Sequence, residues 1–331
     1  MKQTKTLLNL FCFLLITLLL TNTAMAEKAI KLALDSPPDA AKSGTYLWSK
    51  TFADYLTANG TQIKLYPKDS LGAEAEKLDQ VSQGLLEISN SDLAKAGSID
   101  PRVNGFALPF LFKNPAHFYR TVENSNLLPT INEKMSKQGV RLMAVIPLGA
   151  MTGISTTKKF IKTPGDFDGI RMRAMDKEQA KTFQILGANT VIIPWAEIYN
   201  SLQTGVADGY LNPAFVPIMF KHTEVLKYYS AVNFAVSLRV AICSEDWYKS
   251  LTDQKRTLID QAVDKANLAV QDWVSNVGKN ELSNLEKAGM QVYQNTKEEK
   301  ALFAELLRPQ YNKIVSDDIA KLFVKIAEEN L

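Results

Sequence analysis

Apolar and polar positions in the first third of the chain follow the pattern of an α/β protein. Short apolar runs over 29–34 and 62–66 are each followed by proline, as expected of strands that end in a turn. Between them, apolar residues recur at helical spacing from Leu47 to Leu56. A second helix is predicted over 71–83 and a third strand over 85–89. This alternation predicts a largely parallel sheet with helices on both faces.

Two long extended segments lie far apart in the sequence. The strand predicted over 141–146 continues into 152–156 without a compact turn, and a second extended apolar run covers 231–242. Such segments suit a protein with two lobes, because the chain can cross between the lobes near 148–152 and return near 232–240.

We therefore expect three units in the chain. Residues 1–26 form a signal peptide, 27–148 plus about 238–277 form lobe I, and 149–237 plus about 278–331 form lobe II. A helix is predicted over 115–138, and the proline-free stretch 251–290 is strongly helical. A short strand over 291–294 and helical sequence over 298–327 complete the chain.

The stretch from Thr163 to Pro213 contains the first candidate for binding chemistry. Arg171 and Arg173 alternate with apolar residues over 170–174, which is the period-two pattern of a strand. Arg173 falls near the carboxyl end of that strand, just before a helix predicted to begin at Lys177. Ligands of open α/β sheets bind at this edge, so Arg173 is a candidate fork for a carboxylate.

The first residues have the layout of a secretory signal. Lys2 and Lys5 precede an apolar run over 7–20, and small residues lead to a cleavage site predicted after Ala26. A retained membrane anchor is the alternative, but the apolar run is short. Removal of the two lysines lowers the formal net charge from +3 to +1 and leaves Cys243 as the one cysteine of the mature chain. Export without a disulfide indicates a periplasmic protein, and mixed charges argue against a nucleic-acid partner.

Sequence signals for catalysis are lacking. The histidines at 117 and 222 lie in no metal-like cluster, and the chain has no H-E-x-x-H, Walker or G-x-G-x-x-G motif. We therefore expect no metal and no cofactor, and a binding protein rather than an enzyme. The alternative is a secreted hydrolase or lyase that uses Asp35 or Asp92 as a base.

Five motifs in order resemble a known family over nearly all of the mature chain. They are Leu71-Gly72 with Glu76, Gly84 and the 86–88 strand; Leu108 to Phe112; Phe167 to Arg173; Trp195 to Tyr199; and Leu202 to Gly209 with Asn212-Pro213. Together they resemble the DctP-type substrate-binding proteins of tripartite ATP-independent periplasmic (TRAP) transporters.

The resemblance implies a fold, a site and partners. The fold is a bilobed α/β periplasmic-binding-protein fold, with two α/β lobes joined by extended crossing strands and a long helix. Arg173 matches the family's ligand-clamping arginine, Asn212 the asparagine that assists it, and Trp195 the aromatic cover. Asp35 and Asp92 are the first-lobe candidates. The ligand is a small organic acid, delivered to the small and large membrane permease subunits; a binding protein that feeds a membrane receptor is the alternative role.

One departure from the family pattern bears on the ligand. Many members carry a further arginine in the strand that leaves the crossing segment, and Met151 falls about where it would lie. A second ligand carboxylate would lose that partner, whereas Asp35 and Asp92 would accept from hydroxyl or ammonium groups. We therefore expect a monocarboxylate with hydroxyl, keto or amino groups rather than a dicarboxylate, with Met151 among the residues that line the site.

Overall fold

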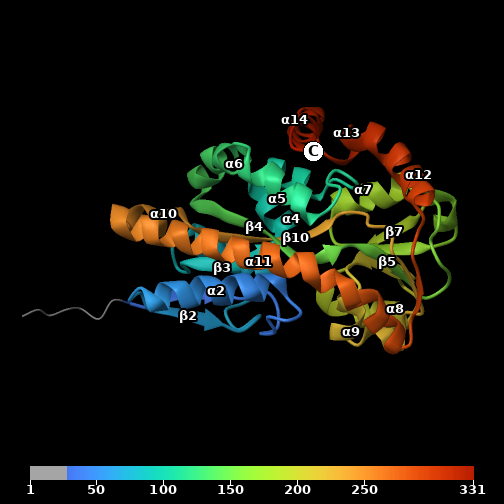
Figure 1. Cartoon of the computed structure of the whole chain (residues 1–331), viewed down its shortest axis with the longest axis horizontal. Helices are drawn as coiled ribbons and strands as arrows, with labels where there is room; N and C mark the ends of the chain where they lie inside the picture. The colour runs from blue at the N-terminus through green and yellow to red at the C-terminus, as the bar shows by residue number, and fades with distance from the viewer. Residues whose placement is uncertain (1–27) are drawn as a thin grey trace, which may run out of the picture.

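Two mixed β-sheets form the framework of the molecule. The computed structural model describes residues 28–331, so the expected signal peptide and its cleavage after Ala26 lie outside the described residues. The first sheet has the order β2-β1-β3-β10-β4, and the second has the order β11-β9-β5-β8-β6-β7. Helices cover both sheets, and the long helix α11 runs past both (Figure 1).

The strands of the first sheet are short except for the two that cross toward the second. Its members are β1 (Ile30–Ala33), β2 (Ile63–Tyr66), β3 (Ile88–Asp92), β4 (Val140–Met151) and β10 (Val236–Ser244). Strands β1, β2 and β3 are parallel, and β10 runs antiparallel between β3 and β4. The second sheet contains β5 (Gly153–Thr156), β6 (Arg171–Ala174), β7 (Asn189–Ile192), β8 (Gly209–Asn212), β9 (Tyr228–Ser230) and β11 (Gln291–Tyr293).

The helices alternate with the strands as an α/β fold requires. They are α2 (Gly44–Ala58), α3 (Glu74–Ser82), α4 (Leu93–Ile99), α5 (Pro115–Glu123), α6 (Leu127–Met135), α7 (Lys177–Ile185), α8 (Ile198–Gln203), α9 (Phe215–Met219), α10 (Glu245–Ser250), α11 (Asp253–Lys287), α12 (Lys297–Leu307), α13 (Tyr311–Ile314) and α14 (Asp317–Glu329). Short 3₁₀ turns connect several of them, among them η1 (Pro101–Ala107), η4 (Trp195–Glu197) and η6 (Arg308–Gln310).

The two crossing segments lie side by side at the boundary between the sheets. Strand β4 ends at Met151 and β5 begins at Gly153, so Thr152 alone separates the two sheets in the first crossing. The Thr152 N–H donates to the Ala235 carbonyl at 2.8 Å, and the Phe234 N–H donates to the Thr152 carbonyl at 2.9 Å. The return crossing before β10 is therefore hydrogen-bonded to the outgoing one.

Helix α11 forms the third link between the lobes. It has 35 residues and is thus about 50 Å long. It packs on α2 and β4 of the first lobe and on α9 and β11 of the second. With the two sheets and the crossing strands, this helix confirms the predicted bilobed α/β fold.

Two of the expected elements differ in the structure. The helix expected over 115–138 is broken into α5 and α6, because Asn124 ends the first and Asn126 precedes the second. The strand expected over 85–89 begins only at Ile88. Gly84 has a φ of +71°, and the Leu85 and Leu86 N–H groups both donate to the Gln80 carbonyl, which keeps them in the cap of α3.

The exact lobe boundaries remain a prediction. The apolar core on one face of the first sheet includes Phe323 of α14, which packs edge-on against Phe106 at a centroid distance of 4.9 Å. Helix α14 also contacts α5 and η1 (Figure 1). This packing argues against placing all of residues 278–331 in lobe II.

The contact between α2 and β4 generates the first testable prediction. A Cβ added at Gly44, the first residue of α2, would lie 2.0 Å from the Pro147 carbonyl oxygen of β4. We expect Gly44→Ala to lower the free energy of unfolding by about 1–3 kcal/mol, because the obstructing atom belongs to the main chain. Denaturant unfolding measures the change.

Gly165→Ala is the matched control for this substitution. The nearest atom to a Cβ there is Thr163 Oγ1 at 3.8 Å, which is an ordinary contact. We expect that variant to stay within about 0.5 kcal/mol of the wild type. Equal unfolding midpoints for the two variants would contradict the close approach of α2 and β4.

Candidate functional site

The candidate site residues of the second lobe lie at the carboxyl ends of neighbouring strands. Strands β6, β7 and β8 are parallel, with β6 in the middle. Arg173 precedes the last residue of β6, Trp195 follows β7, and Asn212 ends β8. The predicted helix at Lys177 is α7, so Arg173 lies at the strand edge that its sequence pattern indicated.

Arg173 is a buried cation whose outer nitrogens are unoccupied. Its side chain is tied at Nε, which donates to the Ile193 carbonyl at 3.0 Å, and the residue is only 7% exposed. Among residues 28–331, neither Nη atom has a hydrogen-bond or ion-pair partner. Burial lowers the pKa of Arg173 to about 10, although Asp92 and Asp176 oppose this effect. The guanidinium is thus positioned and desolvated, and within residues 28–331 no carboxylate pairs with it directly, although Asp92 and Asp176 act on it through space.

Trp195 packs beside this guanidinium on an aromatic wall. The centre of the Arg173 guanidinium lies 5.8 Å from the Trp195 ring, within the range of a cation–π contact. Phe220 packs edge-on against Trp195 at 4.8 Å, and His222 lies 5.6 Å away. The Tyr210 hydroxyl lies 3.0 Å from Nδ1 of His222. The half-buried Trp195 therefore has one packed face and a fixed orientation.

Asn212 and Met151 are close to the crossing but make fewer contacts. Asn212 pairs with Gly153 of β5, and its main-chain carbonyl accepts from the Tyr229 hydroxyl at 3.3 Å. Within the described part of the chain its side chain has no hydrogen bond, so the amide is available to a ligand. Met151 ends β4 opposite Val236 and packs against the core of the first lobe.

Asp35 and Asp92 are brought together by an arginine that the sequence analysis did not select. Arg239 of β10 pairs with Asp92 of β3 in the antiparallel register, so both side chains lie on the same face of the sheet. Its Nε donates to Asp35 Oδ2 at 2.6 Å, its Nη1 lies 3.2 Å from Asp92 Oδ2, and its Nη2 pairs with Glu74.

These charges form a cluster in the first lobe, made of Asp35, Glu74, Lys77, Asp92 and Arg239. Burial alone would lower the pKa of Arg239, but Glu74, Asp35 and Asp92 together hold it well above its usual value. Lys77 is 1% exposed and donates to the carbonyl oxygens of Leu34 and Asn90. A single arginine in the apolar run of β10 was the sequence signal for this cluster.

The first-lobe cluster faces the second-lobe site. The negative charge of Asp92 acts on both Arg173 and Asp176, which caps α7. The ammonium group of Lys68, after β2, lies 5.9 Å from the ring of Phe220. Charged and aromatic groups of the two lobes thus meet around Arg173, although no hydrogen bond joins Arg173 to Asn212, Asp35 or Met151 among the described residues.

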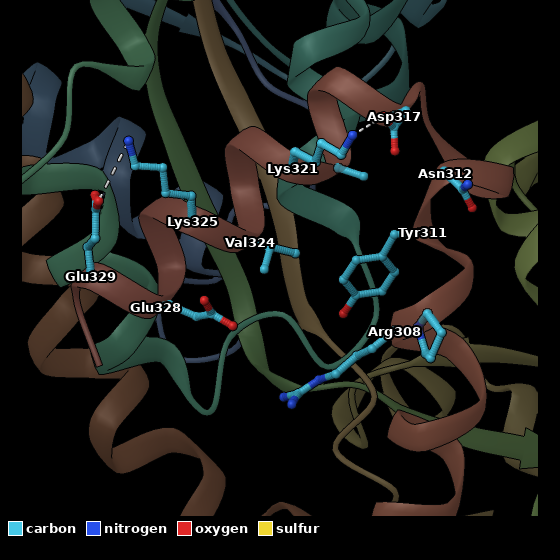
Figure 2. Close-up of a pocket in the computed structure, with 11 residues that line it drawn as sticks. Arg308, Tyr311, Asn312, Asp317, Lys321, Val324, Lys325, Glu328 and Glu329 are labelled. Carbon is cyan, nitrogen blue, oxygen red and sulfur yellow. Dashed lines mark ion pairs between the residues drawn. The ribbon is translucent and has the colours of Figure 1, made fainter.

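A separate hollow of about 600 Å³ lies at the other end of the chain, along η6, α13 and α14 (Figure 2). Its acidic and basic side chains balance, and two pairs of them, Lys321 with Asp317 and Lys325 with Glu329, are exposed ion pairs that contribute little free energy. None of the predicted site residues lines it. The lining residues are Arg308, Pro309, Tyr311, Asn312, Asp317, Ala320, Lys321, Val324, Lys325, Glu328 and Glu329.

The described residues contain neither a metal-binding cluster nor a membrane-spanning helix. Over residues 28–331, no group of three or more His, Cys, Asp or Glu side chains is arranged to hold a metal ion. In the same part of the chain, every helix is either too short or too polar to cross a bilayer.

Two lobes that meet around a buried arginine, unpaired at its Nη atoms within residues 28–331, are the arrangement expected of a solute-binding protein. The chain belongs to the family of bacterial extracellular solute-binding proteins, family 7 (DctP), whose model matches residues 36–318. This match confirms the resemblance drawn from the motifs, and it places the chain among the substrate-binding proteins of TRAP transporters.

Relatives of different named specificity are similar to the chain. The ectoine/5-hydroxyectoine-binding periplasmic protein UehA of Ruegeria pomeroyi is 26% identical over 265 residues, 78% of each chain. The C4-dicarboxylate-binding periplasmic protein DctP of Rhodobacter capsulatus is 25% identical over 307 residues, 90% of each chain. A solved TRAP periplasmic solute-binding protein from Chromohalobacter salexigens, with bound D-glucuronate, has a TM-score of 0.81 at 20% identity, covering 92% of this chain and 100% of that one.

His222, behind Trp195, makes the aromatic wall sensitive to acid. Burial lowers the pKa of His222 to about 4 from its ordinary 6.5, so the folded protein favours the neutral ring. Between these two values the unfolded chain binds more protons, and the contribution of His222 to stability is lost as the pH falls from about 6.5 to about 4.

We expect the variant His222→Asn to lack this loss. The difference in free energy of unfolding between wild type and variant should change with pH by at most about 1.4 kcal/mol per unit inside this window, and should be constant above pH 7. Urea unfolding at a series of pH values measures it. Parallel stability curves for the two proteins would show that His222 does not titrate in this way.

Proposed function

We propose that this protein is the periplasmic component of a TRAP transporter that captures a small organic acid between its lobes and delivers it to the membrane permease subunits. The observation that carries the proposal is Arg173, which is buried, oriented by Ile193 and, among residues 28–331, unpaired at both Nη atoms. A desolvated guanidinium without a counterion is unfavourable, and a carboxylate can relieve it through two parallel hydrogen bonds.

The mechanism is binding without chemistry. The ligand carboxylate docks on the two Nη atoms of Arg173, Asn212 donates to it from the neighbouring strand, and Trp195 covers it and excludes water. Contacts to groups of the first lobe then favour the closed arrangement over the open one, because those contacts exist only when the lobes meet. The permease would recognise this closed form.

The polar groups opposite Arg173 favour a monocarboxylate with hydroxyl, keto or amino groups. Met151 supplies no cation for a second carboxylate, and the acids of the first lobe accept hydrogen bonds from donors. The relatives do not fix this choice, since one is named for C4-dicarboxylates and another structure holds D-glucuronate. The ligand class of this chain is thus proposed from its own residues.

Asp35 and Asp92 support binding over the alternative of a secreted hydrolase or lyase. Each places an oxygen on the guanidinium of Arg239. A general base must reach the proton that it removes, and these two oxygens are held on the Arg239 guanidinium instead.

Arg173→Ala tests the proposed site. A thermal-shift screen over organic acids, sugar acids and amino-acid derivatives first identifies a ligand that stabilises the wild type. Calorimetry with that ligand should then show a loss of about 2–5 kcal/mol of binding free energy in Arg173→Ala, because the buried carboxylate is left unpaired.

Arg171→Ala is the control from the same strand. Arg171 is exposed and its Nη1 donates to the carbonyl oxygens of Gly205 and Val206, so its loss should leave the affinity unchanged. Wild-type affinity in Arg173→Ala would remove Arg173 from the site. Recovery of a chemically altered ligand after incubation would instead support the enzyme alternative.

The proposal includes export and removal of residues 1–26. A chain expressed with its leader in a Gram-negative host should yield a periplasmic protein that begins at Glu27, because the small residues before it suit a signal peptidase. Intact-mass measurement of the periplasmic fraction checks the cut. A mass that still includes the leader would contradict cleavage after Ala26.

A further inference from the structure

Arg173 of the second lobe and Arg239 of the first have opposite surroundings. Arg173 has two Nη atoms without a partner among the described residues, whereas all three sides of the Arg239 guanidinium are occupied by carboxylates. Asp92 acts on both, through an ion pair with Arg239 and through its charge on Arg173. The two guanidinium groups therefore differ in the number of carboxylates that pair with them.

The carboxylates around Arg239 are fixed by further contacts. Glu74 also accepts the Asp92 N–H at 3.0 Å, and Asp92 caps α4 by accepting the Ala94 N–H at 3.3 Å. With Lys77 included, three negative and two positive side chains leave one net negative charge on this wall. Arg239 cannot turn toward a ligand without breaking these pairs.

One acceptor of the cluster is left without a donor. Asp35 Oδ1 is buried and has no hydrogen-bond partner in the part of the chain that the structure describes, and the whole residue is 7% exposed. Asn90 Nδ2 and Ser91 Oγ on the adjacent strand β3 are likewise buried and unpartnered. Buried polar atoms of this kind are unfavourable unless a donor or acceptor reaches them.

We infer that Arg239 is a masked cation, and that Asp35, Glu74 and Asp92 make the first-lobe wall a filter that rejects a second ligand carboxylate and selects a hydroxyl or ammonium group at the far end of the ligand. The inference rests on the proposed function, in which the near end of the ligand is a carboxylate on Arg173.

The filter acts through charge and through occupied donors. A second carboxylate at this wall would approach three carboxylates and find no free guanidinium edge, so it would lose its hydration without compensation. A hydroxyl or ammonium group instead brings hydrogen-bond donors to the carboxyl oxygens of the wall. Both effects change if one of the three carboxylates is neutralised.

Asp92→Asn neutralises one carboxylate while keeping its shape. Asparagine is as good an N-cap as aspartate, so α4 should still form. With its Oδ1 still accepting the Ala94 N–H, the asparagine presents its Nδ2, a donor, to Nη1 of Arg239 and cannot accept from it. This frees one edge of that guanidinium and removes the net negative charge of the wall.

The test compares acids that differ only at the far end. The probes are D-gluconate with D-glucarate, and 4-aminobutyrate with glutarate, each titrated by calorimetry into the full mature chain. We expect the wild type to bind the monocarboxylate of a pair more tightly than the dicarboxylate. Asp92→Asn should reduce that preference by about tenfold to a hundredfold, the value of a hydrogen bond between charged groups.

Two controls separate a filter from a purely structural cluster. Glu74→Gln neutralises another member of the cluster. Glu74 is not an N-cap residue, and the glutamine can still accept the Asp92 N–H through its amide oxygen. This variant should shift the preference in the same direction. Asp100→Asn removes a buried carboxylate that also caps a helical turn and pairs with an arginine, Arg102, outside the cluster. It should lower stability without changing the preference between paired acids.

Each outcome decides a separate question. An unchanged preference in both Asp92→Asn and Glu74→Gln, or a wild type that binds both members of a pair equally, would overturn the filter and leave the Arg173 site intact. Retained affinity in Arg173→Ala would instead overturn the proposed function. A wild type that binds no member of either pair would overturn the filter, because neither far-end donor would then be selected, and would leave the proposed function to the Arg173→Ala measurement with the ligand from the screen.

Discussion

The arrangement of the lobes depends on a short set of main-chain hydrogen bonds at the boundary of the two sheets. Thr152 donates to Ala235 and accepts from Phe234, so the outgoing and returning segments are joined at the point where the chain changes sheet. Strands β4 and β10 continue from this point into the first sheet as paired neighbours, and Arg239 lies on β10. The boundary and the charge cluster are therefore linked by the same strand.

The two lobes differ in how their facing arginines are paired. The second lobe presents a desolvated cation with open donors, fixed by the Ile193 carbonyl and by Trp195. The first lobe presents a cation whose donors are consumed and whose surrounding acids exceed it in charge. Under the proposed function, a ligand that is negative at one end and a donor at the other would match both lobes and would bind in one orientation.

Local sequence patterns were sufficient to place Arg173 of the second lobe but not the charge cluster of the first, and Trp195 and Asn212 were selected only through the family resemblance. Arg173 could be placed because the alternation of 170–174 and the helix at Lys177 lie within a few residues of it. The partners of Arg239 lie 204 residues away at Asp35 and 165 away at Glu74, and only the register of β10 against β3 brings them together. The break between α5 and α6 was missed because apolar spacing continues across it, while two asparagines set the ends.

The position of α14 adds a further constraint on how the lobes can move. After α12 and α13, which contact α7 of the second lobe, the chain returns to the first lobe and buries Phe323 against Phe106 (Figure 1). The segment η6–α13 is thus another covalent bridge between the lobes, next to the hollow of Figure 2. A rigid rotation must leave the lengths of this bridge, of α11 and of both crossing strands unchanged. Few axes satisfy all of these conditions, so the covalent path of the chain restricts the direction of closure before any ligand is bound.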